Sequence, residues 1–247
     1  MTETSSTGSQ VGRAPPAGTG EERSSPRVIS APCRNRSESG DSLDYEVIHG
    51  SSFCFYRFNN PSLVERLQEV CLAAEGDILK LPVAKGWEKE QEAQKMQQFG
   101  TTARFPFYNM LLLRDISVIH VFRAIQRCYI TMAEKQGLDQ SPVWVQCWEN
   151  VLRRDGHLHK HAHNFFRHGH LTVATPGSRT GYEFGNGEII EIENEPGLLT
   201  LIGQPGLMHY TTPNPSDRPR ISIAFDLCRV PEMNNDMMNR HTFIPLL

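Results

Sequence analysis

The 247-residue chain lacks a strong excess of either charge and lacks any long apolar run. Its formal net charge is −3, whereas a general surface for nucleic acid or for an acidic membrane needs a basic excess. No stretch approaches the ~18 apolar residues that cross a bilayer. The start, MTETSSTGSQ, has neither the basic nor the apolar segment of a secretory signal. We therefore expect no nucleic-acid partner, no membrane partner and a cytoplasmic location.

Closely spaced cysteines are also missing. The six cysteines are widely scattered, and no two of them form a Cys-x-x-Cys pair. Such pairs and dense cysteine frameworks are typical of zinc sites and of small disulfide-bonded secreted domains. We expect reduced, mostly buried thiols, which agrees with the cytoplasm.

Aromatic residues are absent from residues 1–44, which are rich in Ser, Gly, Pro, Arg and Glu. A segment of this composition buries too little apolar surface to offset the entropy lost on ordering. We predict a disordered tail over 1–44 and a single domain over 45–247. Its predicted parts are a helical region over 45–140, a strand-rich core over 141–230 and a C-terminal extension over 231–247.

The first half of this domain shows one strand pattern and two clear helix patterns. The stretch SSFCFYRF at 51–58 predicts a strand, and the apolar spacing over 61–76 predicts a helix that ends at its glycine. Residues 117–137 have apolar side chains at spacings of three and four and also end at a glycine, which predicts an amphipathic helix. The polar stretch 86–100 predicts a helix or an ordered loop.

After Pro142 the sequence changes to short runs of β-branched and aromatic residues separated by turn residues. Several short strands joined by tight turns are typical of a small antiparallel barrel or sandwich. We expect the helices to support one face of it. The predicted strands are 143–153, 171–175, 187–193, 197–203 and 220–227.

The stretch RRDGHLHKHAHNFFRHGH (153–170) holds six of the ten histidines. Four of them alternate with other residues, at His157, His159, His161 and His163. In an extended segment, alternate side chains point to the same side, so neighbouring histidines of this set can share one metal ion. A His-x-His pair predicts half of a metal site, with further ligands from elsewhere in the fold.

A second group of candidate residues follows the turn GQPG. His209 comes after an apolar strand, Arg220 begins a later strand, and Ser222 lies on the same face as Arg220. A guanidinium beside a hydroxyl is suited to bind a carboxylate. Because Arg220 begins a strand that otherwise looks buried, with Ile221 and Ile223 next in it, the arginine normally needs an anionic partner.

In this order, HAH (161–163), His209 and RIS (220–222) resemble the 2-oxoglutarate/Fe(II)-dependent oxygenase superfamily, over about residues 143–228. The resemblance implies a double-stranded β-helix, a jelly-roll barrel similar to cupins, mainly β and supported by N-terminal helices. It implies Fe(II) held by His161, His163 and His209, with O2 as oxidant. It also implies 2-oxoglutarate bound through Arg220 and Ser222.

The sequence departs from that superfamily at one ligand. The superfamily pattern has a carboxylate where His163 stands, although some members have His-x-His there. We prefer the pair His161/His163 to His159/His161 because Gly156 and Gly169 match the spacing in those members. Loose similarity of NFFRHGHL to aspartyl/asparaginyl β-hydroxylases suggests a two-histidine site as another possibility.

Two other carboxylates lie near enough in the sequence to complete such a site. For Asp155 we expect a role in the turn beside Gly156. For Glu183 we expect a structural or substrate-contact role. A site of three histidines leaves the metal more positive than the usual set and suits an anionic chelator such as 2-oxoglutarate.

The resemblance implies an oxygenase that oxidises a small molecule, for which an amino acid or peptide-like compound is our expectation. The sequence carries no indication of an oligomeric state and none of the substrate-binding residues. Two alternatives stay open. One is a cupin-type three-histidine metalloenzyme without 2-oxoglutarate, since GQPGLMHYTTPN resembles the second cupin motif. The other is a non-catalytic metal-binding β-barrel.

Overall fold

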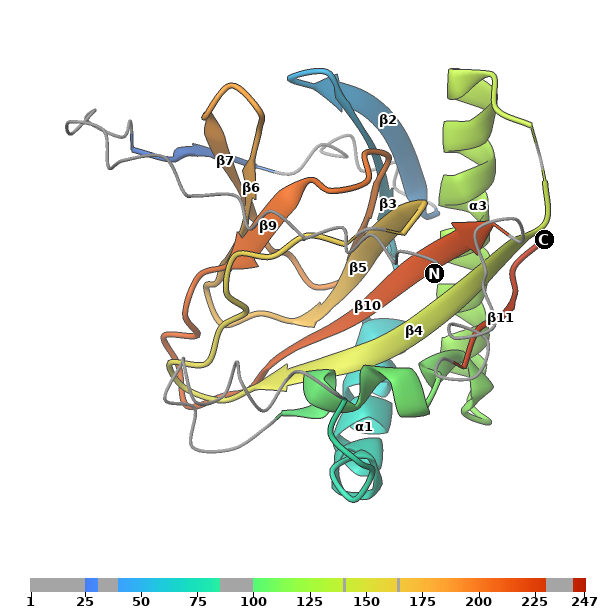
Figure 1. The fold of residues 1–247 in the computed structure, drawn as a ribbon. Coiled ribbons are helices and arrows are strands. Elements are labelled where there is room, and N and C mark those ends of the chain that lie inside the picture. Colours follow the sequence, from blue (N-terminus) through green and yellow to red (C-terminus); the bar gives the residue numbers. More distant parts are fainter. Residues whose placement is uncertain (1–24, 31–39, 85–99, 140, 164, 230–241) are drawn as a thin grey trace, which may run out of the picture.

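A computed structural model gives the fold of the chain as two facing β-sheets with helices against the larger sheet (Figure 1). It describes residues 25–30, 40–84, 100–139, 141–163, 165–229 and 242–247. The strands are β1 (Arg27–Ile29), β2 (Ser42–Ile48), β3 (Ser51–Arg57), β4 (Val143–Leu152), β5 (Arg167–Ala174), β6 (Arg179–Glu183), β7 (Ile189–Glu193), β8 (Leu198–Ile202), β9 (Met208–Thr211), β10 (Arg220–Arg229) and β11 (Ile244–Pro245). The helices are α1 (Pro61–Ile78) and α3 (Ile116–Gln136), with the 3-10 helices η1 (Thr101–Phe107) and η2 (Met110–Leu112).

The strand order is that of a double-stranded β-helix. The larger sheet has the order β11-β4-β10-β5-β8-β3-β2, and the smaller sheet has the order β1-β7-β6-β9. The segment 156–163 runs antiparallel beside β9, through backbone hydrogen bonds that include both directions between His161 and His209. Eight consecutive segments from β4 to β10 thus divide equally between the two sheets, as in a jelly roll. The predicted fold class is confirmed.

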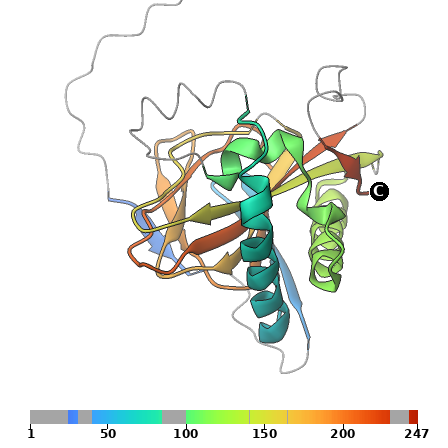
Figure 2. The ribbon, with the colours of Figure 1, turned by 90° about the horizontal axis from the view of Figure 1, so that it is seen from below.

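The helices pack on the outer face of the larger sheet, where α1 and α3 lie beside each other (Figure 2). Helix α3 begins where the Asp115 side chain accepts a hydrogen bond from the Ser117 amide and ends at Gly137, whose φ is 60°. Glycine adopts this left-handed conformation without steric cost, so the predicted end is confirmed.

Helix α1 begins as predicted at Pro61, with Asn60 as its cap, but it ends at Ile78. The prediction that Gly76 ends this helix is wrong. Gly76 has no positive φ, and a glycine in ordinary helical conformation weakens a helix by only about 1 kcal/mol without stopping it.

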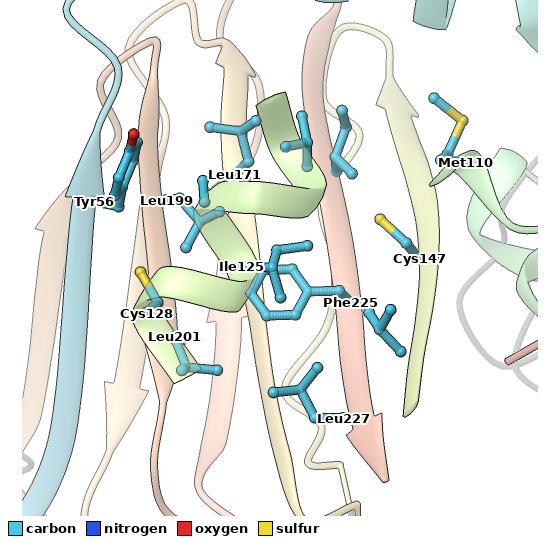
Figure 3. Close-up of a cluster of buried hydrophobic side chains, with 14 of the residues drawn as sticks. Tyr56, Met110, Ile125, Cys128, Cys147, Leu171, Leu199, Leu201, Phe225 and Leu227 are labelled. Atoms are coloured by element: carbon cyan, nitrogen blue, oxygen red, sulfur yellow. The ribbon is translucent and has the colours of Figure 1, made fainter. Parts of the chain in front are cut away.

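The main core lies between the helices and the larger sheet. Ile125 and Cys128 of α3 face Leu171, Leu199 and Phe225 of the sheet (Figure 3). These side chains are at most 1% exposed. Alternate residues of the same strands face the barrel interior instead, as the period of two requires.

The cysteines within the described residues are all buried thiols outside any disulfide, which confirms that prediction for Cys54, Cys71, Cys128, Cys147 and Cys228. Cys33 lies outside the described residues. Within the described part of the chain, no helix combines the length and the apolar character that crossing a bilayer requires.

The predicted tail is wrong at two places. Arg27–Ile29 form β1, which pairs parallel with β7, and β2 already begins at Ser42. The composition of residues 1–44 gives no sign of these strands. They depend on partners far along the chain, because β1 pairs with β7 and Ile29 packs against a buried cluster. Residues 1–24 and 31–39, and all but Gly100 of the element predicted at 86–100, lie outside the described residues.

The predicted strands are confirmed, with differences at their ends. The largest difference is in β5, which begins at Arg167, whereas the prediction placed the start at Leu171. This extension matters because it places His168 and His170 on a strand whose alternate residues line the barrel interior.

Candidate metal centre and its cavity

A cavity of about 530 Å³ occupies one end of the barrel interior. Its walls are formed by β4, β5, β6, β9 and β10, by the segment 156–163 and by residues 100–105 at η1. Every site residue that the sequence indicated lies on these walls: His161, His163, His209, Arg220 and Ser222. The barrel therefore brings together residues that are far apart in the chain.

The histidine-rich segment is extended but is not a continuous strand. It bends at Lys160 and forms a single bridge, at His161, to β9. Its four alternate histidines line the cavity, together with Leu158, Lys160 and Ala162 between them. They divide into two pairs, because the rings of His157 and His159 lie 4.3 Å apart before the bend.

The second pair joins His209 to form a three-histidine group. One nitrogen atom from each of His161, His163 and His209 lies within 4.8 Å of the others. The ring centroids are 4.3 Å apart for His161 and His209, and 5.2 Å apart for each of the other two pairs. His159 lies outside this group.

The hydrogen bonds of the three rings fix which nitrogen is available. The Nδ1 atom of His161 lies 2.6 Å from the His159 carbonyl oxygen, and that of His209 lies 3.1 Å from the Leu207 carbonyl oxygen. A carbonyl oxygen only accepts, so each Nδ1 carries the proton. The unprotonated Nε2 atoms are then available to a metal, which is the usual arrangement of histidine ligands.

His163 follows the same pattern with a different acceptor. Its Nδ1 atom lies 2.6 Å from Oδ1 of Asp226, whose side chain is on β10. Asp226 is 1% exposed. Sequence reasoning missed this residue, although counting by twos from Arg220 along RISIAFDL places Asp226 on the cavity face of the strand.

Burial determines the protonation of these imidazoles. It lowers the pKa of His161 and, with the neighbouring histidines, lowers the pKa of His209 well below its ordinary value. For His163, burial alone lowers the pKa, but the charge and hydrogen bond of Asp226 outweigh it and raise the pKa. His161 and His209 are therefore neutral at neutral pH, with lone pairs that no proton occupies.

His163 is also held by stacking. Trp148 of β4 and His168 of β5 flank β10, and both rings are nearly parallel to His163, at centroid distances of 5.9 and 4.9 Å. His168 is 2% exposed, and within the described residues neither of its nitrogens has a hydrogen-bond partner. Sequence reasoning did not assign a role to either flanking ring.

Arg220 lies deeper in the same cavity and is 1% exposed. Its Nε donates to Ser178 Oγ at 3.0 Å, and its Nη1 donates to Ser222 Oγ at 3.4 Å. Among the described residues it forms no ion pair. Burial lowers its pKa to about 10, so the guanidinium stays charged at neutral pH and needs an anion.

His170 lies beside this cation on β5. Burial first, and then the charge of Arg220, lower the pKa of His170 to about 3. This imidazole is therefore neutral and does not compete with Arg220 for an anion.

The two other carboxylates that the sequence suggested do not join the histidines. Asp155 lies in a turn with a φ of 63°, and its amide donates to the Asn214 carbonyl oxygen at 2.8 Å. This confirms the predicted turn role. Glu183 forms an ion pair with Lys160.

Comparison with known proteins gives likenesses of fold only. No family model and no curated protein matches the sequence. Solved structures of similar fold include 2-oxoglutarate/Fe(II) oxygenases. A prolyl-4-hydroxylase from Pseudomonas putida is 15% identical, with 77% of this chain and 88% of that chain covered and a TM-score of 0.47.

Two further structures are similar at the same level. The α-ketoglutarate-dependent carbocyclase SnoK of nogalamycin biosynthesis is 10% identical, with 79% and 92% of the two chains covered and a TM-score of 0.48. The non-haem monooxygenase ThoJ is 13% identical, with 69% and 70% covered and a TM-score of 0.45. Because each TM-score lies below 0.5, none of these likenesses bears on what this chain does.

Proposed function

We propose that the protein is a 2-oxoglutarate- and Fe(II)-dependent oxygenase that uses O2 to oxidise a small molecule. The observation that carries the proposal is the presence, in one cavity, of three converging histidines and a buried arginine that has no anionic partner among the described residues. His161, His163 and His209 would hold the metal through Nε2. Imidazole nitrogens suit Fe(II), and three protein ligands leave positions for other ligands.

Arg220 and Ser222 would bind the cosubstrate. The guanidinium would pair with the far carboxylate of 2-oxoglutarate, and the Ser222 hydroxyl, which Asn150 also contacts at 3.3 Å, would lie beside it. Neutral ligands also favour an anionic chelator at the metal. Bound iron would supply the activation of oxygen, which no side chain supplies, while the walls position the substrate and exclude water.

The cavity volume agrees with a small-molecule substrate. About 530 Å³ lies within the ~300–1,000 Å³ typical of sites for such ligands. An amino acid or peptide-like compound is the class that we propose. We also propose that residues 45–247 belong to one domain, which β1 and the first residues of β2 join, and that the protein acts in the cytoplasm.

A three-histidine metalloenzyme that does not use 2-oxoglutarate is the second candidate. The geometry of the histidines supports it equally well, since it needs the same metal. An enzyme without 2-oxoglutarate has no anionic cosubstrate that would pair with Arg220. A non-catalytic metal-binding barrel has none either. The buried cation therefore favours the oxygenase.

The deciding experiment measures binding without turnover. Protein loaded anaerobically with Mn(II) is heated with and without 2-oxoglutarate, and Arg179→Ala serves as the matched control for Arg220→Ala. Arg179 is a half-exposed arginine of β6 that pairs with Glu191, away from the histidines. We expect 2-oxoglutarate to raise the Tm of the wild type and of Arg179→Ala but not of Arg220→Ala. An unchanged Tm of the loaded wild type would favour the second candidate.

A further inference from the structure

Asp226 is a carboxylate in direct contact with one of the three histidines. Within the described residues, its side chain has one hydrogen-bond partner, Nδ1 of His163, at 2.6 Å. It is 1% exposed. A buried carboxylate is costly unless it is paired, so this contact is a strong constraint on both side chains.

The position of Asp226 explains why it is not itself in the ligand group. His161 and His163 come from the segment beside β9, on the side of the smaller sheet, whereas Asp226 projects from β10 of the larger sheet. Its carboxylate contacts Nδ1 of His163, so Nε2, on the opposite edge of the ring, is the nitrogen left for the group of three histidines. The carboxylate therefore reaches the far edge of the imidazole, away from the other two histidines.

We propose that Asp226 supplies, through His163, the negative charge that a directly bound carboxylate would supply. The inference rests on the proposed function, in which His161, His163 and His209 hold the metal. Three neutral imidazoles contribute no charge, and Asp226 contributes −1, so the total equals that of two histidines and one carboxylate. The negative charge of Asp226 is then farther from the metal than that of a directly bound carboxylate, by the width of one imidazole ring.

The same contact makes Asp226 a positioning residue. A carboxylate on Nδ1 sets the tautomer of His163, directs Nε2 toward His161 and His209, and increases the basicity of that nitrogen. Stacking by Trp148 and His168 restricts tilting of the ring but leaves rotation within its own plane. The hydrogen bond to Asp226 removes that remaining freedom.

The test compares Asp226→Asn with Glu191→Gln. The asparagine keeps the size and an acceptor oxygen but removes the charge. The control makes the same chemical change at a 7% exposed carboxylate of β7, which contacts Tyr210 and Arg179. The anaerobic Kd of Co(II) is measured at one pH by calorimetry, together with the visible spectrum of the bound ion.

We expect Asp226→Asn to weaken Co(II) binding about 10- to 100-fold, the usual effect of losing such a partner, and to shift the visible bands. Glu191→Gln should leave both unchanged. Asp226→Glu, which keeps the charge, should bind Co(II) more tightly than Asp226→Asn. Equal Kd values and spectra for Asp226→Asn and the wild type would overturn the inference.

The control His209→Ala separates this inference from the proposed function. If His209→Ala loses Co(II) while Asp226→Asn keeps it, the metal site stands and the role of Asp226 is refuted. If the wild type does not bind Co(II) at all, the proposed function itself fails.

A measurement on the wild type covers the case in which Asp226→Asn does not fold. Histidine labelled with ¹⁵N in the Zn(II)-loaded protein should show a strongly downfield proton on Nδ1 of His163. Coordination of zinc by Nδ1 of His163 would overturn the inference.

Discussion

The two faces of β10 differ in what their buried side chains contact. Toward the helices, its residues are apolar and pack against α1 and α3; Phe225 is 0% exposed among them. Toward the cavity, Arg220, Ser222 and Asp226 are buried to nearly the same degree. The helix face is satisfied by its own neighbours, whereas Arg220 on the cavity face lacks an anion within the described residues. Equal burial therefore has two meanings: one face stabilises the fold, and the other is the face on which we propose that ligands bind.

This difference predicts that substitutions on the cavity face change binding far more than stability. His209→Ala removes one of three nitrogens and should abolish metal binding and metal-dependent succinate formation. His157→Ala, from the pair outside the group, is the matched control and should retain both. Calorimetry measures the binding of Co(II), and a succinate assay measures turnover. Unchanged turnover in His209→Ala would refute the assignment of His209 as a metal ligand.

The reverse is expected on the helix face. Phe225→Ala should lower the free energy of unfolding by about 3–5 kcal/mol, because it leaves a cavity against α3. Urea unfolding measures the loss. The Kd of Co(II) for the folded protein should stay within about twofold of the wild type, and a much larger change would show that the two faces are coupled.

Arg220→Ala is expected to raise the Kd of 2-oxoglutarate. Loss of a buried charged partner costs about 2–5 kcal/mol, or roughly 30-fold or more. The Kd of Co(II) should change little, because Arg220 does not belong to the histidine group. Titration of the Mn(II)-loaded protein with 2-oxoglutarate measures the affinity, with Arg179→Ala as control. Equal Kd values for Arg220→Ala and the wild type would refute the role of Arg220 in binding 2-oxoglutarate.

The smallest effect concerns Glu149, a carboxylate of β4 that is 0% exposed and lies beside the thiol of Cys71. Burial raises its pKa to about 8 from the ordinary value of 4.5. Between these pH values the folded state keeps a proton that the unfolded state loses, so stability falls as pH rises through this window.

Glu149→Gln removes this titration. The variant should become more stable relative to the wild type by about 1.4 kcal/mol as the pH rises from 6 to 7. Urea unfolding at several pH values measures the difference. Parallel stability profiles for the two proteins would contradict the assignment.

Much of the fold could be predicted because it follows from local patterns. Apolar spacing gave α3 and its end at Gly137, and alternation with turn residues gave the strands. The limits appeared where the outcome depends on distant partners. Residues 27–29 pair with β7 although their neighbours suggested disorder, and α1 passes through Gly76 because its packing outweighs one glycine.

The sequence by itself determined which kinds of side chain reach the cavity. Residue type and alternation along the strand are readable in the sequence for five of them: His161, His163, His209, Arg220 and Ser222. Only the tertiary structure decided how they are completed. It placed Asp226 on Nδ1 of His163 and left Arg220 buried beside hydroxyls. The physical reason is that residue type and alternation are properties of a segment, whereas a hydrogen bond between two sheets depends on how the barrel closes.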